Sequence, residues 1–139
     1  MDYKKFEDKY ILRLNKGDEI LESLESLVKK ENIRLASVTG IGALGKAEIG
    51  LFNSRKKKYF SKVFQEDMEI VSLNGNISEM NGEPYLHLHI ALADESLKLV
   101  GGHLNYGLIS LTGEIIVDTI KGEIDREFDE EVGLNLIKF

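Results

Sequence analysis

The 139-residue chain contains no cysteine and no tryptophan, and it has a single proline. The absence of cysteine excludes disulfides, thiolate metal sites and cysteine nucleophiles. The sequence also lacks an apolar run of ~18 residues that could cross a membrane. Its N-terminus is not the basic and then apolar segment that is typical of a signal peptide. We therefore expect a cytoplasmic protein with no membrane partner.

Basic residues are few as well, because 18 Lys and Arg stand against 24 Asp and Glu and leave a formal net charge of -6. Nucleic-acid affinity rests mainly on Lys and Arg that neutralise phosphates, so we expect no intrinsic DNA binding. The one basic cluster, residues 55–58, is typical of a solvated hairpin loop. With 42% hydrophobic and 30% charged residues, the composition predicts one folded domain over residues 1–139.

One segment, residues 18–31, has the apolar spacing of an amphipathic helix, and Asp18 is its expected N-cap. Most of the remaining sequence has the short alternating runs of β-strands, and Asn81-Gly82 favours a tight antiparallel hairpin. The predicted fold is α+β, with an antiparallel sheet that forms a sandwich or barrel beside one main flanking helix. The expected strands are residues 10–14, 34–39, 46–52, 59–64, 69–77, 85–93, 99–104 and 108–117, with a short piece near Leu136.

Residues 40–45 match the dinucleotide-binding pattern G-x-G-x-x-G. That pattern binds pyrophosphate only where a helix begins directly after the glycines. Here the next residues, 46–52, alternate as a strand does and contain a further glycine. The sequence therefore argues against nucleotide binding, and the glycines are expected to make a tight connection between two strands.

The three histidines of the chain, His87, His89 and His103, are close together in the sequence. Residues i and i+2 of a strand point to the same face, so His87 and His89 would share one face. Gly101 and Gly102 lack a Cβ and would let the backbone approach a crowded site. Three neutral imidazoles with a free fourth position are typical of a reactive zinc site. We interpret the cluster as a metal site, and histidines hydrogen-bonded within a subunit interface are the main alternative.

With nitrogen ligands and no thiolate, we expect Zn²⁺, and Ni²⁺, Co²⁺ and Fe²⁺ are the alternatives. A reaction at this site would also require a carboxylate that moves a proton. Glu69 and Glu114 are the catalytic candidates, because each lies among apolar strand residues. Either could equally be a carboxylate of an edge strand or of a turn. Arg126 lies between two acidic residues and is expected to form a structural ion pair.

Six strings of the chain resemble, in order, those of the PPC (plants and prokaryotes conserved) domain. They are residues 39–44 (TGIGAL), 69–77 (EIVSLNGNI), 87–94 (HLHIALAD), 101–104 (GGHL), 112–115 (TGEI) and the closing stretch 126–136. The resemblance implies a compact α+β domain, an antiparallel sheet flanked by a helix, that is usually assembled as a homotrimer. It also implies an architecture related to the acetolactate decarboxylases, which bind a metal through three histidines. The matching positions in this chain are His87, His89 and His103.

Plant relatives in this family join the domain to AT-hook segments that bind DNA. This chain has no Arg-Gly-Arg-Pro core of that kind, and it has residues 66–68 (EDM) where the plant motif has Gly-Arg-Phe. Two functional hypotheses follow. The first is a metal-dependent enzyme that acts on a small-molecule substrate. The second is a non-enzymatic homotrimeric module that recruits proteins or associates with DNA, in which any metal is structural.

Overall fold

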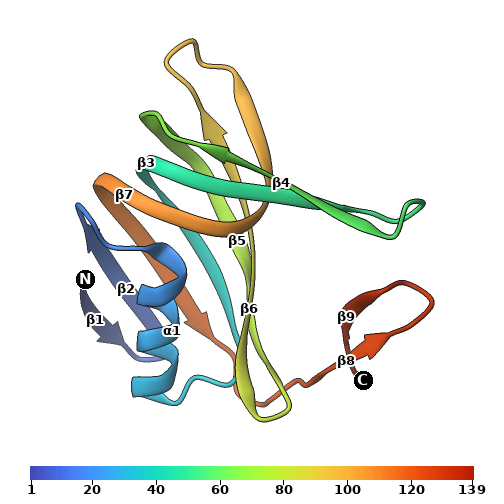
Figure 1. Ribbon diagram of the computed structural model, residues 1–139. Helices are drawn as coiled ribbons and strands as arrows, with labels where there is room; N and C mark the ends of the chain where they lie inside the picture. Colours follow the sequence, from blue (N-terminus) through green and yellow to red (C-terminus); the bar gives the residue numbers. More distant parts are fainter.

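The computed structural model describes residues 1–139 and consists of a strongly curved antiparallel sheet, one helix and a small separate hairpin (Figure 1). The 7-stranded sheet has the order β1-β2-β7-β6-β5-β3-β4, and β8 pairs with β9. The predicted α+β fold is confirmed. No helix of the structure has the length and apolar character needed to cross a membrane. The elements are β1 Asp2–Phe6, β2 Lys9–Asn15, α1 Ile20–Glu31, β3 Ala36–Asn53, β4 Lys58–Phe64, β5 Met68–Met80, β6 Glu83–Ala93, β7 Leu99–Thr119, β8 Arg126–Asp129 and β9 Leu134–Ile137.

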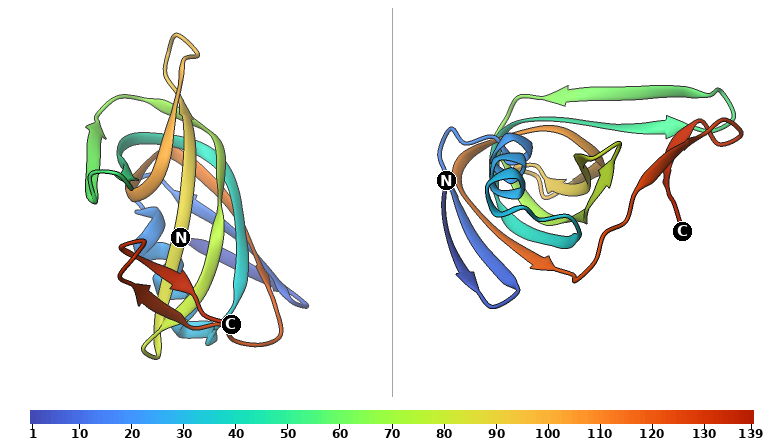
Figure 2. Two further views of the ribbon diagram at one scale, coloured as in Figure 1. Left: turned by 90° about the vertical axis from the view of Figure 1, so that its right-hand side faces the viewer. Right: turned by 90° about the horizontal axis from the view of Figure 1, so that it is seen from below.

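The large sheet closes on itself, because β7 pairs with β3 as well as with β6. The pairs β3–β5, β5–β6, β6–β7 and β7–β3 therefore form a continuous barrel-like ring. Seen from below, the ring curls around α1 (Figure 2). The helix lies against β6 and β7, and its four buried residues, Ile20, Leu24, Leu27 and Val28, belong to the core. Side chains alternate between the two faces of β6, and Leu88, Ile90 and Leu92 point into the same core. The opposite face of β6 therefore belongs to the outer face of the ring.

The prediction that residues 34–39 and 46–52 are two strands joined by a tight glycine connection is wrong. Strand β3 runs through the glycines without a turn, and its pairing register with β5 shifts between Gly40 and Gly42. Gly42 has a φ of 149°, and a Cβ at this position would collide with the carbonyl oxygen of Thr112 on β7. The glycines therefore let one long strand bend and pass close to its neighbour. Because no helix follows them, they cannot form the dinucleotide-binding turn.

Three further strands differ from expectation, and two hairpins agree with it. The expected strands 99–104 and 108–117 are one strand, β7, and neither β1 nor β8 was predicted. Asn81 and Gly82 have φ angles of 55° and 80° and connect β5 to β6 in antiparallel fashion, as predicted. The basic residues 55–58 lie at the exposed turn between β3 and β4, so the prediction of a hairpin loop is also confirmed.

The N-cap of α1 is Glu19, so the prediction of Asp18 is wrong. Asp18 instead accepts a hydrogen bond from the backbone N–H of Asn15 at 2.7 Å. The longer side chain of Glu19 reaches two donors, the backbone N–H groups of Glu22 on the helix and of Gly107 on β7, each at 2.7 Å. A single buried carboxylate thus caps the helix and ties it to the sheet.

We predict that Glu19→Ala lowers the free energy of unfolding by about 2–3 kcal/mol, because it removes the cap and leaves the Gly107 N–H without its acceptor. Glu25→Ala in the same helix is the control. It removes only an exposed ion pair with Lys29 and should cost about 0.5 kcal/mol or less. Chemical unfolding followed by circular dichroism measures both, and equal losses in the two variants would contradict this role of Glu19.

Candidate metal centre

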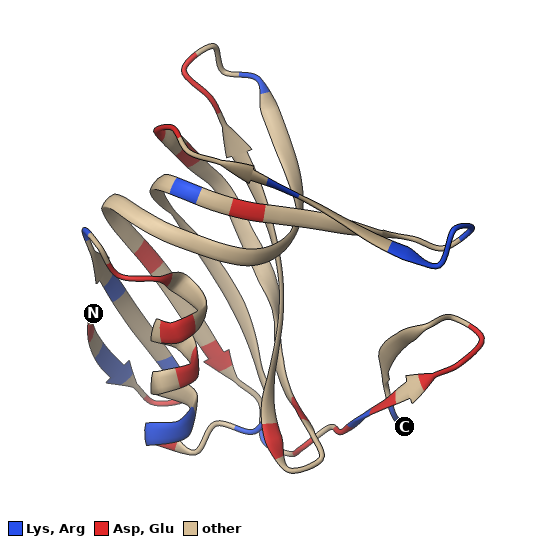
Figure 3. Ribbon diagram, in the orientation of Figure 1, with Lys and Arg blue, Asp and Glu red and all other residues tan.

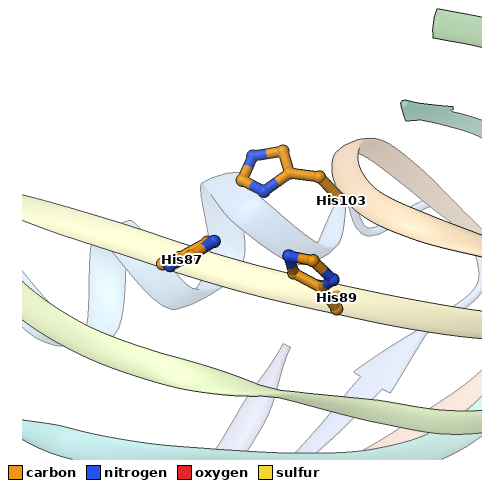
Figure 4. A group of neighbouring side chains, drawn as sticks. All are labelled: His87, His89 and His103. Carbon is orange, nitrogen blue, oxygen red and sulfur yellow. The ribbon is translucent and has the colours of Figure 1, made fainter. Parts of the chain in front are cut away.

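The three histidines gather on the outer face of the ring, where β6 meets β7 (Figure 4). His87 and His89 project from one face of β6, as their spacing predicts. His103 comes from β7, and the antiparallel register sets it directly opposite His89. A Cβ on Gly102 would lie 2.6 Å from the carbonyl oxygen of Gly50 on β3, so only glycine allows β3 and β7 to come this close. The structure thus brings the three histidines together and shows the expected close backbone approach beside them.

The three histidine rings lie close enough together to share a metal ion after their side chains rotate toward it. Their centroids are 5.2, 5.3 and 5.6 Å apart, and each ring offers a nitrogen within 4.8 Å of the other two. Nitrogens around a tetrahedral zinc ion are about 3.3 Å apart, so the side chains would have to turn toward a bound ion. The cluster contains no carboxylate. These residues therefore fit a metal ion with three neutral ligands and an open fourth position.

The surroundings keep two of the histidines in the neutral form that binds metals. Burial, together with the nearby His103, Arg126 and His89, lowers the pKa of His87 from 6.5 to about 4. Burial, and then His89, also lower the pKa of His103. At pH 7 the lone pairs of both rings are consequently free for a metal, without the prior loss of a proton.

Two tyrosines flank the cluster. Tyr59 on β4 approaches His103 edge-on, with ring centroids 6.4 Å apart and an interplanar angle of 88°. Its hydroxyl donates a hydrogen bond to Oδ1 of Asn105 at 2.9 Å, which holds the ring in place. Tyr85 precedes His87 by two residues on β6 and therefore lies on the same face.

Arg126, on β8, is buried next to this face, and the prediction that it forms an ion pair is wrong. Its side chain donates three hydrogen bonds, all to neutral oxygens: Nε to Ser78 Oγ at 2.8 Å, Nη1 to the carbonyl of Asn135 at 3.0 Å and Nη2 to Asn76 Oδ1 at 2.9 Å. Asn76 is the direct cross-strand partner of His87. Arg126 is therefore separated from a histidine of the cluster by a single residue, Asn76.

The sequence could have indicated two of the residues that lie beside the histidines. A two-residue turn at Asn81-Gly82 sets the β5–β6 register, which places Asn76 opposite His87 and Asn74 opposite His89. Nothing local in the sequence pointed to Arg126, because its partners are 9, 48 and 50 residues away.

Glu69 and Glu114, the predicted proton carriers, are exposed and lie away from the histidines within one chain. Glu69 is paired with Ala93, four residues along β6 from His89, or about 13 Å at the usual rise of a strand. Glu114 lies in the C-terminal half of β7 and pairs with Arg13 and Ile41. Across the sheet it is separated from β6 by β5 and β3, or about 14 Å.

The closed antiparallel ring, its single helix and the outer three-histidine cluster define a small α+β domain with a candidate metal centre. The sequence model of the Plants and Prokaryotes Conserved (PCC, also written PPC) domain matches residues 1–121, and the chain belongs to this family. The resemblance found in the sequence is thus confirmed. The curated relatives include proteins named "Bifunctional protein GlmU" from two Synechococcus strains, 30% identical over 127 residues. The match includes 89% of this chain, which spans about a fifth (19%) of their length.

Solved structures share the whole architecture. A Bacteroides thetaiotaomicron protein, described as a candidate for DNA binding, is 38% identical with a TM-score of 0.97, over 99% of this chain and 96% of that one. A protein from Archaeoglobus fulgidus, described as metal-containing, is 32% identical with a TM-score of 0.89, over 99% of this chain and 96% of that one. The α-acetolactate decarboxylase of Bacillus subtilis shares the fold alone, with 12% identity and a TM-score of 0.59 over 88% of this chain and 57% of the decarboxylase.

We predict that the metal-free protein loses stability as the pH falls from about 6.5 to about 4. The pKa of His87 is about 4 in the folded protein, against 6.5 for an ordinary histidine. The unfolded chain therefore binds a proton at a higher pH than the folded protein, and acid favours unfolding in this range. Melting temperatures at half-unit pH steps test this. His87→Asn should flatten the profile between pH 6.5 and 4, the exposed control Lys121→Gln should not, and equal slopes in all three proteins would contradict the effect.

Proposed function

We propose that the protein is a metal-dependent enzyme that acts on a small molecule, with His87, His89 and His103 as ligands of Zn²⁺. The observation that carries this proposal is the meeting of three imidazole nitrogens within 4.8 Å, without any carboxylate or thiolate. A ligand set of this kind suits a catalytic zinc ion, whereas structural zinc sites are usually closed by four protein ligands. The metal-containing relative, 32% identical over 99% of the chain, supports the presence of a metal.

A zinc ion held by three histidines would act as a Lewis acid and lower the pKa of a water in its fourth position to about 7. The chain's own part is to fix the ligands. The strand pairing sets their spacing, Tyr59 packs against the edge of His103, and burial keeps His87 neutral. A proton-carrying role for Glu69 or Glu114 stays a prediction. It requires that a neighbouring subunit bring one of these exposed carboxylates to the histidines.

We propose further that the chain assembles as a homotrimer through the outer face of the sheet. A groove of about 400 Å³ on this face is lined by exposed apolar side chains of Ile11, Ile41, Val71 and Ile116, together with Glu114. Exposed apolar surfaces of this kind commonly mark protein–protein contacts. This surface also supports the second candidate function, a non-enzymatic module whose trimer recruits partner proteins. The net charge of -6 argues against DNA as the partner.

We predict that protein purified without a nickel column contains about one zinc ion per chain, and that His89→Ala reduces the metal to less than about 0.2 per chain. His89 is the exposed histidine of the three, so its truncation should disturb the fold least. Asn74→Ala, at the cross-strand partner of His89, is the matched control and should keep the metal. Elemental analysis measures all three proteins, and equal metal content in His89→Ala and wild type would refute the site.

The melting temperature of metal-free His89→Ala separates the two candidate functions. A variant that loses its metal and still unfolds near the temperature of the metal-bound wild type points to a reactive metal. A metal whose removal unfolds the wild-type protein is structural, since structural zinc carries folding free energy, and this result would favour the interaction module.

We predict that Ile41→Glu converts the assembly to monomers, because it places a charge in an apolar subunit contact. Light scattering after gel filtration should give about three times the 15.7 kDa chain mass for the wild type and about one chain mass for the variant. Leu97→Glu, which changes an 80% exposed side chain in the β6–β7 loop, is the control and should leave the trimer intact. A monomeric wild type would contradict the proposed assembly.

A further inference from the structure

We propose that the three-histidine site binds a small oxyanion, such as a carboxylate or phosphate group, and that Arg126 supplies its counter-charge. The inference rests on the proposed metal-dependent function and names the class of substrate that this site takes. It follows from the charges that the chain gathers around the cluster.

The guanidinium of Arg126 is a buried positive charge without a negative partner. The residue is 5% exposed, and its three hydrogen bonds go to a hydroxyl, an amide and a backbone carbonyl. No ion pair of the protein includes Arg126. Charged side chains are seldom buried to this extent unless an opposite charge accompanies them. A ligand is the missing source of negative charge.

The acidic residues that adjoin Arg126 or its partner Ser78 in the sequence make other contacts than an ion pair with the guanidinium. Asp125 accepts a hydrogen bond from the backbone N–H of Arg126, and Glu127 forms an ion pair with Lys138. Glu79 adjoins Ser78 on β5, but its carboxylate pairs with Arg34 at 2.7 Å. Further acidic residues lie on the β8–β9 loop, which faces the basic tip of the β3–β4 hairpin (Figure 3). The chain therefore leaves Arg126 unneutralised although carboxylates are plentiful nearby.

The position of Arg126 links this charge to the histidines. Nη2 is hydrogen-bonded to Asn76, the cross-strand partner of His87, and the guanidinium lies 4.6 Å from the ring centroid of Tyr85. Tyr85 and His87 are two residues apart on the same face of β6.

The net positive charge of a metal-loaded cluster favours an anionic ligand. Three neutral imidazoles leave both positive charges of a divalent metal uncompensated, and Arg126 adds a third. The stacked ring and three hydrogen bonds fix the plane of the guanidinium. They use three of its five N–H groups, so two donors remain for a ligand. A planar guanidinium beside a metal matches an oxyanion, which can take metal coordination and charge-assisted hydrogen bonds together.

The test uses the chain of residues 1–139 loaded with Co²⁺, whose visible absorption changes when the ligand in its open position changes. Sodium acetate, sodium phosphate and neutral acetamide are titrated at constant ionic strength. We expect saturable spectral changes with acetate, phosphate or both, and none with acetamide; the anion that responds identifies the group. Arg126→Gln should weaken anion binding about tenfold or more while the Co²⁺ content stays the same. Arg55→Gln, at an exposed arginine in the turn between β3 and β4, is the matched control and should bind anions as the wild type does.

Asn76→Asp keeps the side-chain shape and gives Arg126 an internal carboxylate, so it decides the matter even where Arg126→Gln does not fold. We expect this variant to retain Co²⁺ and to bind acetate or phosphate about tenfold more weakly. Unchanged anion affinity in Asn76→Asp, or a wild-type spectrum that neither anion alters, would overturn the inference and leave the metal site standing. A wild type that takes up no Co²⁺ would overturn the proposed function and the inference with it.

Discussion

The antiparallel register between β6 and β7 is the constraint on which the candidate metal centre depends. It sets His103 opposite His89, and the alternation of side chains along β6 brings His87 to the same face. That register is held in turn by the closed ring, because β7 continues past β6 to pair with β3. Glycine at position 102 is what allows β7 and β3 to approach closely beside the histidines. The site is thus built on rigid strand pairing.

The charges around the cluster determine which kind of ligand the site favours. The histidines are neutral ligands, the cluster has no carboxylate, and the buried guanidinium of Arg126 adds positive charge without a negative partner. Arg126 also anchors the C-terminal hairpin, since it hydrogen-bonds to β5 through Ser78 and Asn76 and to β9 through Asn135. The Arg126 side chain therefore both holds the C-terminal hairpin against β5 and adds positive charge to the site. Relatives that share this fold are described as metal-containing and as candidates for DNA binding.

The sequence predicted what depends on local pattern and missed what depends on contacts across the fold. Alternation and the Asn81-Gly82 turn were enough for β6, for its hairpin and for the shared face of His87 and His89. The glycines of residues 40–45 were misread, because a bend inside a long strand and a turn between two strands use the same residue type. Glu19 and Arg126 were missed or misread because their partners on β7, β5 and β9 are distant in the sequence. The roles of Glu69 and Glu114 depend on the assembly, which local sequence patterns do not determine.

The central claim is that His87, His89 and His103 together hold a metal ion. X-ray absorption spectroscopy at the edge of the metal present in the purified protein tests it most directly, because the fine structure reports the number, kind and distance of the ligands. The account predicts three imidazole nitrogens at about 2.0–2.1 Å and one further light atom in the open position. A shell made only of oxygen atoms, as for a metal bound by surface carboxylates, would contradict it.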